Sequence, residues 1–355
     1  MDKETFAIKV PVHMANKVIQ TLRKLKLLDV RFEFGRSDRA LILPITREPS
    51  RNEISWISEG DEITVERVRL GEARRRPRDL KEAMGTELTE AIMSKLPRSF
   101  DVVGDIAILE LPHELDQIAH SVGKGVLELN PHLRLVVRKS SDISGTYRTR
   151  SFTTIAGTGG TETICREYSN LLRLDIASVY FSPRLSHERM RVASQANEGE
   201  RVIDLFAGVG PYSILIAKTQ PKSMIYSIDI NPEAFRYLRE NILLNHVADR
   251  VVPIFGDART IVKRSLRKVA SRIIMNLPSE AINFMDVALD ALQDCGGVIH
   301  YYAFASRNET TDSIIDPVRR EVERHGKKVR SLRYASVLKE VAPNRIQMAM
   351  DLDVR

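Results

Sequence analysis

The 355-residue chain has 43% hydrophobic and 28% charged residues, which is enough for two or three domains with packed cores. Its 54 Lys and Arg residues exceed its 47 Asp and Glu residues, and this moderate excess permits an anionic partner without requiring one. Two cysteines exclude a disulfide framework and a cysteine-rich zinc site, so we expect no bound metal. No signal peptide or membrane-length apolar run is visible, so we expect a cytoplasmic protein that does not bind membranes.

The first part of the chain alternates between strand and helix patterns. Residues 5–12 indicate a strand, residues 13–29 an amphipathic helix and residues 31–45 a hairpin. These patterns predict a small α+β domain over residues 1–70. The polar passage at 66–83 indicates either a solvated linker or a contact with phosphates. Its clustered arginines are Arg74, Arg75, Arg76 and Arg78.

Two further regions follow. The first alternates strand patterns with one helical pattern at 113–129, which predicts a second α+β domain over residues 71–175. In the second, near-continuous apolar strands alternate with helices, as in a parallel sheet covered on both faces. The last two strand patterns, at 328–338 and 344–354, predict antiparallel additions at the edge of that sheet. The sequence therefore predicts an α/β protein whose third domain, residues 176–355, has a Rossmann-like, mostly parallel, seven-stranded sheet.

The ends of the parallel strands carry the candidate ligand contacts, because ligands of open parallel sheets lie beyond the carboxyl ends of the strands. Four successive strand patterns end in glycine, aspartate or asparagine, which a chance arrangement rarely produces. From the first to the fourth strand, the candidate residues are Asp204, Phe206, Gly208 and Gly210; Asp229 and Ile230; Asp257 and Ala258; and Asn276 and Pro278.

The turn VIDLFAGVGPYSI at 202–214 differs from a dinucleotide-binding turn. Ser213 occupies the place of the third glycine, and Pro211 removes a donor from the helix N-terminus that a pyrophosphate would use. Asp204 places negative charge near the ligand, which suits a cation better than a phosphate. S-adenosylmethionine, with a sulfonium, an ammonium and no phosphate, fits this description. Gly208 and Gly210 would let the backbone approach it.

The later strand ends complete the predicted nucleoside site. Asp229 can accept hydrogen bonds from both ribose hydroxyls, and Asp257 can accept one from the adenine amino group. The alternative is that both carboxylates cap the helices that follow them, although Asn231 before Pro232 is itself a good cap.

Several motifs resemble the archaeal and eukaryotic tRNA (guanine-37-N1)-methyltransferases, and the archaeal branch most closely. The resemblance covers about residue 95 to the C-terminus. The motifs are TYRTR, VYFSPRLSHERMRV, DLFAGVGPYSI, IDINPEAFRYLRENILLN, MNLPSEAINF and GGVIHYYAF. It implies a class I methyltransferase domain that transfers a methyl group from S-adenosylmethionine to N1 of guanosine 37, and smaller domains that bind the anticodon stem-loop and body of a tRNA. A monomer fits this asymmetric partner.

The resemblance also implies roles for individual residues. Guanine N1 carries a proton, so its methylation needs a general base and a donor for charge on O6. The family's base corresponds to Glu188, and its O6-stabilising arginine to Arg148, with Arg150 as the alternative. Asn276 corresponds to the residue that orients the base, and Pro278 stiffens its loop. Phe206, Tyr180 and Tyr212 are candidate stacking partners that can equally be core residues.

Other interpretations stay open. Glu188 can form a surface salt bridge with Arg184 or Arg191, which lie at helical contact spacing. A wyosine-pathway enzyme on the same scaffold would transfer an aminocarboxypropyl group, or methylate both N1 of guanosine and C7 of a tricyclic base. A non-catalytic tRNA-binding protein is disfavoured by the intact site residues, and a nicotinamide-dependent dehydrogenase by the missing third glycine. Leu277 argues against methylation of an exocyclic amino group, for which an N-P-P motif is typical.

Overall fold

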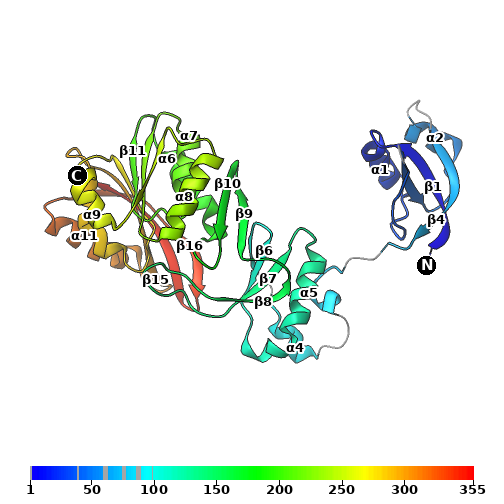
Figure 1. The fold of residues 1–355 in the computed structure, drawn as a ribbon, viewed down its shortest axis with the longest axis horizontal. Coiled ribbons are helices and arrows are strands. Elements are labelled where there is room, and N and C mark those ends of the chain that lie inside the picture. Colours follow the sequence, from blue (N-terminus) through cyan, green and yellow to red (C-terminus); the bar gives the residue numbers. More distant parts are fainter. Residues whose placement is uncertain (1, 38–39, 59–62, 74–76, 85–88, 98) are drawn as a thin grey trace. The chain divides into compact units, whose positions relative to one another are not determined.

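The computed structural model describes residues 2–37, 40–58, 63–73, 77–84, 89–97 and 99–355. The chain divides into two compact units, Met1–Arg78 and Asp79–Arg355, which Figure 1 shows in colours that follow the sequence. The division separates the first unit from all that follows. The three predicted domain ranges stay a prediction.

The first unit is a four-stranded sheet with two helices. Its central strand β1 pairs antiparallel with both β3 and β4. Helix α1 buries Val18 and Leu22, four residues apart, against this sheet, as the amphipathic pattern predicts. In the spatial order of the sheet, the strands are β2 (Gly35–Ser37), β3 (Ala40–Ile45), β1 (Asp2–Pro11) and β4 (Thr64–Gly71). The helices are α1 (Ala15–Lys24) and α2 (Arg51–Ser58).

The predicted linker at 66–83 is partly regular structure. Residues 66–71 belong to β4, which pairs with β1 over its whole length. The linker interpretation is therefore wrong for this part, because the polar side chains of an edge strand conceal a strand pattern that only half faces the core. Arg74, Arg75 and Arg76 lie outside the described residues.

The second unit begins with a four-stranded sheet in the order β5-β6-β7-β8. Helix α5 packs on it, with Gly123 so close that a Cβ atom would lie 2.7 Å from the Ala156 side chain. A two-stranded hairpin, β9–β10, follows. The strands are β5 (Asp101–Val103), β6 (Ile106–Leu109), β7 (Leu135–Lys139), β8 (Phe152–Gly157), β9 (Glu162–Glu167) and β10 (Asn170–Asp175). The helices are α3 (Leu80–Met84), α4 (Glu90–Lys95), the 3-10 helix η1 (His113–Ile118) and α5 (Ala119–Leu129).

The rest of the unit is the predicted seven-stranded, mostly parallel sheet, in the order β13-β12-β11-β14-β15-β17-β16. The first five strands in that order are parallel, and β17 and β16 are antiparallel additions at one edge. The predicted fold class is thus confirmed. The strands are β11 (Arg201–Asp204), β12 (Met224–Asp229), β13 (Val251–Phe255), β14 (Arg272–Met275), β15 (Gly297–Ser306), β16 (Val329–Ala342) and β17 (Arg345–Val354).

Helices cover both faces of this sheet, which explains its near-continuous apolar strands. Neighbouring residues Val202 and Ile203 of β11 point into separate cores, one built with α6–α8 and the other with α9–α11. The helices are η2 (Pro183–Leu185), α6 (Ser186–Gln195), α7 (Pro211–Thr219), α8 (Pro232–Leu244), α9 (Ala258–Ile261), the π-helix η3 (Val262–Leu266), η4 (Ala281–Phe284), α10 (Met285–Ala291) and α11 (Thr311–Arg324).

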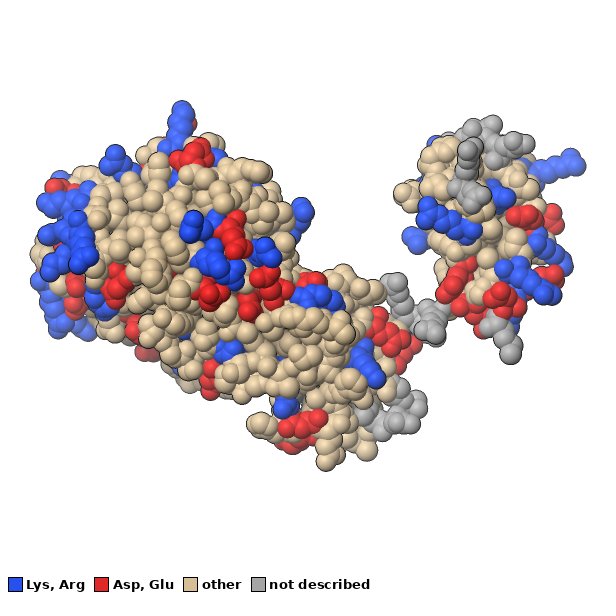
Figure 2. Space-filling model, viewed as in Figure 1, with Lys and Arg blue, Asp and Glu red and all other residues tan. Residues whose placement is uncertain are grey.

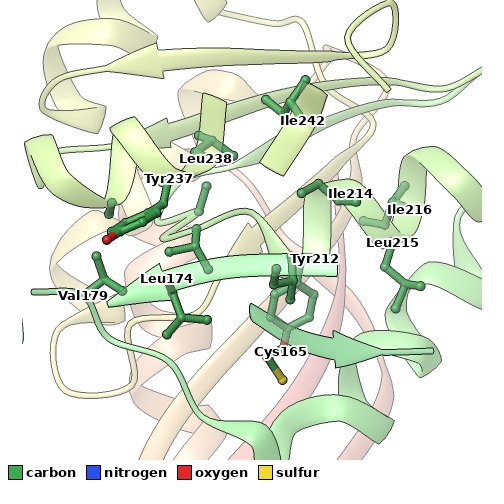
Figure 3. Packing of buried hydrophobic residues seen from close by; sticks show 14 of the residues in the cluster. Cys165, Leu174, Val179, Tyr212, Ile214, Leu215, Ile216, Tyr237, Leu238 and Ile242 are labelled. Atoms are coloured by element: carbon green, nitrogen blue, oxygen red, sulfur yellow. The ribbon is translucent and has the colours of Figure 1, made fainter. Parts of the chain in front are cut away.

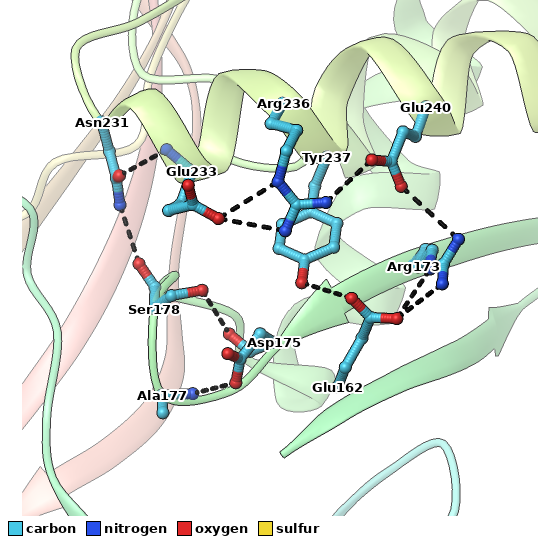
Figure 4. A network of polar contacts seen from close by, with 10 residues as sticks. All are labelled: Glu162, Arg173, Asp175, Ala177, Ser178, Asn231, Glu233, Arg236, Tyr237 and Glu240. Carbon is cyan, nitrogen blue, oxygen red and sulfur yellow. Dashed lines mark hydrogen bonds and ion pairs between the residues drawn. The ribbon is translucent and has the colours of Figure 1, made fainter. Parts of the chain in front are cut away.

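The hairpin β9–β10 is joined to the sheet domain by apolar and polar contacts. Figure 3 shows Cys165 and Leu174 of the hairpin packed beside Tyr212 of α7 and Leu238 of α8. Figure 4 shows the polar counterpart, in which Glu162 of β9 accepts a hydrogen bond from Tyr237 of α8 at 2.8 Å. These contacts place the segment after β10, residues 176–185, beside the carboxyl ends of the parallel strands.

Asn241 of α8 and Asn245, which caps the end of that helix, hydrogen-bond to the backbone of β10 as a neighbouring strand would. Asn241 accepts from the Arg173 N–H at 2.7 Å and donates to the Arg173 carbonyl at 2.9 Å and to the Val209 carbonyl at 3.0 Å. Asn245 repeats this pairing with Leu171 one helical turn later. The side chains thereby satisfy buried backbone groups at the edge of the hairpin.

Asn241→Leu should destabilise the second unit by about 2–4 kcal/mol, because it leaves buried donors and acceptors without partners. Urea unfolding should be followed by far-UV circular dichroism, since the fluorescence of the single tryptophan, Trp56, reports the first unit. Asn308→Leu, at an exposed turn, is the matched control. Equal midpoints for the two variants would contradict the structural role of Asn241.

Candidate functional site

A cavity of about 330 Å³ opens beyond the carboxyl ends of the parallel strands. Its walls are the turns after β11, β12, β13 and β14, completed by residues 145–148 and 180–182. This volume suits a nucleoside-sized ligand. The cavity therefore lies at the carboxyl ends of the parallel strands, where the sequence predicts ligand binding.

The two glycines after β11 serve different purposes. Both have left-handed backbones, with φ of 56° at Gly208 and 89° at Gly210. A Cβ atom on Gly208 would meet only the Tyr180 carbonyl oxygen, 3.8 Å away, so this side of the turn is open. A Cβ atom on Gly210 would lie 2.5 Å from Leu238 Cδ1, in the contact between α7 and α8. Gly208 lines the cavity, whereas Gly210 allows the helices to pack and does not line it.

Two predicted carboxylates lie at the cavity wall. Asp229 accepts the Gly208 N–H at 2.6 Å and the Asn231 N–H at 2.9 Å, and burial raises its pKa. Asp257 accepts the Arg259 N–H at 2.7 Å and caps α9, so the capping alternative describes one of its contacts. A carboxylate has about four acceptor positions. Both side chains can therefore bind hydroxyl or amino hydrogens of a ligand as well.

An apolar wall lies beside these carboxylates. Phe206 and Phe284 meet edge to face, with their ring centroids 4.9 Å apart. The Arg259 guanidinium lies over the Phe284 ring, 3.6 Å from its centroid. Ile230, 38% exposed, also lines the cavity. Rings and aliphatic groups in this arrangement suit the faces of a planar ligand.

Arg148 reaches the cavity from the loop before β8. Its backbone is left-handed, with φ of 54°, and its N–H donates to the Gly145 carbonyl at 3.1 Å. Its Nη1 donates to Ser279 Oγ at 2.5 Å, in the loop after β14. Arg150 lines a smaller neighbouring cavity instead. Of the two candidate arginines, the geometry favours Arg148.

The loop after β14 forms the wall opposite the β12 and β13 turns. Asn276, Leu277 and Pro278 line the cavity. The loop is held by backbone hydrogen bonds, from the Leu277 N–H to the Met275 carbonyl at 2.8 Å and from the Ala281 N–H to the Leu277 carbonyl at 2.8 Å. Asn276 therefore sits on a fixed turn that Arg148 contacts through Ser279.

Glu188 is buried in α6 and does not line the cavity. Both of its oxygens accept hydrogen bonds from Arg191, each at 2.7 Å. The salt bridge predicted as an alternative thus exists, but it is buried rather than on the surface, and Arg184 pairs with Asp101 instead. Glu188 Oε1 also accepts from the Tyr302 hydroxyl at 2.7 Å.

A chain of hydroxyl groups links Glu188 to the cavity wall. Tyr302, which donates to Glu188, accepts a hydrogen bond at 3.0 Å from the hydroxyl of Tyr212. Tyr212 is among the residues that line the cavity, although it is only 2% exposed. Two routes therefore connect Glu188 to the cavity wall. Its neighbour in α6, Arg189, lines the cavity. Two hydrogen bonds, through Tyr302 and Tyr212, lead from its carboxylate to the same wall.

Asp204 lies behind the glycine turn and is fully buried. Its Oδ2 accepts from Ser213 Oγ at 3.0 Å, and Ser213 accepts from Ser227 Oγ at 2.8 Å. Among the described residues, its Oδ1 finds no side-chain or backbone hydrogen-bond partner of good geometry. Burial raises the pKa of Asp204 to about 7. A serine at position 213, where a dinucleotide-binding turn has its third glycine, is therefore explained by the structure: its hydroxyl donates a hydrogen bond to the Asp204 carboxyl group.

The structure brings most of the predicted site residues to one cavity. Those that line it are Arg148, Phe206, Gly208, Asp229, Ile230, Asp257, Ala258, Asn276 and Pro278. Glu188, Asp204 and Gly210 lie behind its wall. The geometry thus places each residue, while the roles in binding and catalysis stay predictions.

Sequence reasoning missed two residues that line the cavity, Phe284 of the apolar wall and Arg259, whose guanidinium covers the Phe284 ring. Arg259 directly follows the third strand end in the motif DAR, which is a detectable signal for a nearby side chain. Phe284 lies eight residues beyond Asn276 in a 3-10 helix, and only the packing of η4 against Phe206 brings it to the cavity.

The charge of the second unit is mixed. On the face shown in Figure 2, Lys and Arg gather over the end that carries α9 and α11, while acidic and basic side chains alternate elsewhere. The described part of the chain has no group of three His, Cys, Asp or Glu placed to hold a metal ion. Within the same residues, no helix is both long and apolar enough to span a bilayer.

Three family profiles match successive parts of the chain. They are the tRNA methyltransferase 5 N-terminal domain at residues 7–53, the TYW2 N-terminal domain at residues 80–161 and the TRM5/TYW2 methyltransferase domain at residues 163–332. The last of these contains both the glycine turn and the four strand ends.

Individual proteins are similar over most or nearly all of the chain. The tRNA (guanine(37)-N(1))-methyltransferase Trm5b of Pyrococcus abyssi is 40% identical over 350 residues, which is 99% of each chain. The tRNA 4-demethylwyosine(37)-methyltransferase Taw21 of Saccharolobus solfataricus is 34% identical and covers 72% of this chain and 93% of its own. The structure of Methanocaldococcus jannaschii Trm5 in complex with adenosine is 30% identical, with a TM-score of 0.64 over 98% of this chain and 99% of that one.

Asp204→Asn should remove a pH dependence from the stability of the second unit. Because the folded-state pKa of Asp204 is raised to about 7, its proton stabilises the fold at low pH, and this stabilisation is lost as pH rises from about 4 to about 7. Relative to the asparagine variant, the wild-type free energy of unfolding should fall across this window by up to about 4 kcal/mol. Urea titrations at several pH values measure this, with exposed Asp286→Asn as the control. A constant difference between wild type and Asp204→Asn would show that Asp204 does not titrate there.

Proposed function

The chain belongs to the TRM5/TYW2 family of tRNA methyltransferases, and we propose that it transfers a methyl group from S-adenosylmethionine to N1 of guanosine 37 in tRNA. The observation that carries this proposal is that one cavity is lined both by the predicted nucleoside contacts, Asp229 and Asp257, and by Arg148 and Asn276. A tRNA bound through its anticodon stem-loop and body, a monomeric enzyme and a cytoplasmic location complete the proposal.

The residues after β11, β12 and β13 fit the methyl donor. Gly208 leaves space where a side chain would stand, and Asp229 beside it has acceptor positions for ribose hydroxyls. The wall of Phe206 and Ile230 suits an adenine ring, and Asp257 can accept from its amino group. When bound, S-adenosylmethionine supplies a methyl group that its sulfonium makes electrophilic. Asp204, buried behind the turn, would act on the donor only through the turn it holds.

Arg148 and Asn276 fit the acceptor base. Removing the N1 proton of guanine shifts negative charge to O6, and a guanidinium donor at that oxygen stabilises it. Arg148 lines the cavity and is held by its hydrogen bond to Ser279 in the loop after β14, and Asn276 lies on the same loop. We assign O6 stabilisation to Arg148 and orientation of the base to Asn276. The stacking surface is supplied by Tyr180, which lines the same wall.

Glu188 is the proposed acceptor of the N1 proton. The Tyr302 and Tyr212 hydroxyls connect its carboxylate to the cavity wall, so a proton that leaves guanine has a hydrogen-bonded acceptor within the protein. Its neighbour Arg189 is held by Glu167, with Nε and Oε1 2.7 Å apart, which fixes this turn of α6.

A second candidate function is a wyosine-pathway activity on the same scaffold. The match of residues 80–161 to the TYW2 N-terminal domain, together with the similarity to Taw21, favours keeping it. It includes a methylase that acts on both N1 of guanosine and C7 of a tricyclic base, and an aminocarboxypropyl transferase. Alkylation of a side carbon needs no base at N1, so the aminocarboxypropyl version leaves Glu188 without a role.

Purified protein with S-adenosylmethionine should convert an unmodified G37 tRNA transcript to one containing N1-methylguanosine. Nucleoside mass spectrometry identifies the product, and a transcript with adenosine at position 37 is the control. If the unmodified transcript yields no N1-methylguanosine and a tRNA that carries the tricyclic base becomes aminocarboxypropylated instead, the second candidate is supported and the first refuted. A C7-methylated product, on a tRNA that carries the tricyclic base, would show the bifunctional enzyme.

Glu188→Gln should lower single-turnover methyl transfer by at least about a hundredfold, because glutamine cannot take up the N1 proton. The Kd for S-adenosylmethionine, measured by calorimetry, should change little, since Glu188 does not line the cavity. Unchanged turnover would remove Glu188 from the mechanism.

Arg148→Ala should lower turnover by about 100- to 1,000-fold, as loss of an oxyanion donor does, with little effect on S-adenosylmethionine binding. Arg150→Ala is the matched control, because Arg150 lies two residues away and lines the other cavity. A larger loss in Arg150→Ala than in Arg148→Ala would reverse the assignment.

A further inference from the structure

Glu188 is the end of a chain of buried charged groups that runs between α6 and the strands β17, β15 and β14. Arg191 joins Glu188 to Asp351 of β17, with Nη2 and Oδ1 2.9 Å apart. Asp351 contacts His300 Nδ1 at 2.6 Å, and His300 Nε2 contacts Arg272 Nη1 at 2.8 Å. The chain ends at Glu200, whose Oε2 accepts from Arg272 Nε at 2.6 Å. The chemistry assigned to the cavity uses none of these partners.

Arg191 is shared by two carboxylates. Its Nε and Nη2 donate to Glu188, while Nη1 and Nη2 donate to Asp351. The Tyr334 ring covers the guanidinium at 3.9 Å, which fixes its plane. The positive charge of Arg191 is therefore shared between Glu188 and Asp351, and it stays paired with Asp351 if Glu188 is protonated.

The protonation state of His300 follows from its partners. A guanidinium only donates hydrogen bonds, so Nε2 of His300 accepts from Arg272 and its proton lies on Nδ1. That proton is donated to Asp351. Burial lowers the pKa of His300, in keeping with a neutral ring. Asp351 thus receives one neutral donor and one cation.

The charges of these buried groups, from Glu188 to Glu200, do not balance. Glu188, Asp351 and Glu200 are three carboxylates, whereas Arg191 and Arg272 are two cations. The pKa of Asp351 is lowered by its hydrogen bonds from His300 and Arg191 against the effect of burial, and that of Glu200 by Arg272 in the same way. These two stay ionised. The buried groups therefore carry one surplus negative charge, and Glu188 is the carboxylate among them that the tyrosine hydroxyls link to the cavity wall.

We propose that Asp351 is a positioning residue for the methyl transfer: by holding Arg191, it keeps Glu188 basic enough to accept the proton of guanine N1. This inference rests on the proposed function. Without the charge of Asp351, the whole charge of Arg191 would act on Glu188 and oppose its protonation. His300 supports the same arrangement by fixing the Asp351 carboxylate from the other side.

The proton and electron balance of the step is simple. The electron pair of the N1–H bond of guanine forms the new N1–CH₃ bond, and the proton goes to the Glu188 carboxylate. The electron pair of the S–CH₃ bond stays on sulfur, which becomes a neutral thioether. The charged chain then passes from one surplus negative charge to none, with Arg191 still paired to Asp351.

Other groups packed around Glu188 do not supply a competing charge. From α7 and β15 come the Tyr212 and Tyr302 hydroxyls, whose pKa values burial raises far above neutrality. Arg189 on the next position of α6 is neutralised by Glu167 of β9. Tyr334 of β16 faces Arg191. The charges that act on Glu188 are therefore those of Arg191 and, through it, of Asp351.

The test is the pH dependence of single-turnover methyl transfer at saturating S-adenosylmethionine with a G37 transcript. In Asp351→Asn, the acid limb of the rate should move down by about one pH unit and the plateau should fall about tenfold, since Glu188 becomes a weaker base. Arg191→Lys, which cannot make both hydrogen bonds of Arg191 to Glu188, should instead move the acid limb to higher pH. KM for tRNA and Kd for S-adenosylmethionine should stay within about twofold of wild type.

Controls separate this role from mere structural support. Asp353→Asn, two residues along β17 and paired with exposed Arg333, should leave the profile unchanged. Asp351→Glu restores the charge and should return the acid limb to its wild-type position. A structural role would slow the variants without moving the limb. If Asp351→Asn does not fold, the upward shift in Arg191→Lys still decides.

The outcomes distinguish the two levels of the proposal. Wild type that forms no N1-methylguanosine refutes the proposed function itself. Wild type that forms it, with acid limbs of both variants unmoved, refutes only the role of Asp351. A plateau rate that is unchanged in Asp351→Asn also refutes that role, because Glu188 is then no weaker a base without the charge of Asp351.

Discussion

The parallel pairing of β11 with β12 and β14 is the constraint on which the site depends. It brings the turns after these strands to one edge of the sheet, so residues 72 positions apart, Asp204 and Asn276, end neighbouring strands. The glycine turn crosses that edge, and Asp229 ties it to the next strand through the Gly208 amide. The same pairing positions β15 and β17, which carry the partners of Glu188.

The cavity is completed by parts of the chain outside the sheet domain. Asn241 and Asn245 hold β10 against α8, and the segment that follows brings Tyr180 to the cavity. Arg148 comes from the loop before β8 and reaches across to Ser279. A contribution from both parts suits the reaction between two substrates that we propose, in which the strand ends would bind the nucleoside donor and the added loops the base.

The strand ends of the sheet were predictable from the sequence, since each is a short apolar run followed by a glycine, an aspartate or an asparagine, a pattern local to a few residues. Of the groups around Glu188, Arg191, three residues along α6, was also predictable, whereas Tyr302 and Asp351 were not. Asp351 lies 163 positions away, and only the antiparallel addition of β17 to β15 brings it near α6. Local patterns also failed for β4, an edge strand with polar side chains, and for Gly210, whose space is filled by Leu238 of a later helix.

The left-handed backbone of Arg148 has a consequence for the entropy of binding. Arginine on a mobile loop would lose up to about 2 kcal/mol of rotamer freedom when it contacts a ligand. Here the turn fixes the direction of Cβ, and the bond to Ser279 restrains the far end of the side chain. Most of that freedom is already lost before any ligand arrives. The folding of the chain, rather than the encounter with RNA, therefore bears the cost of ordering this cation.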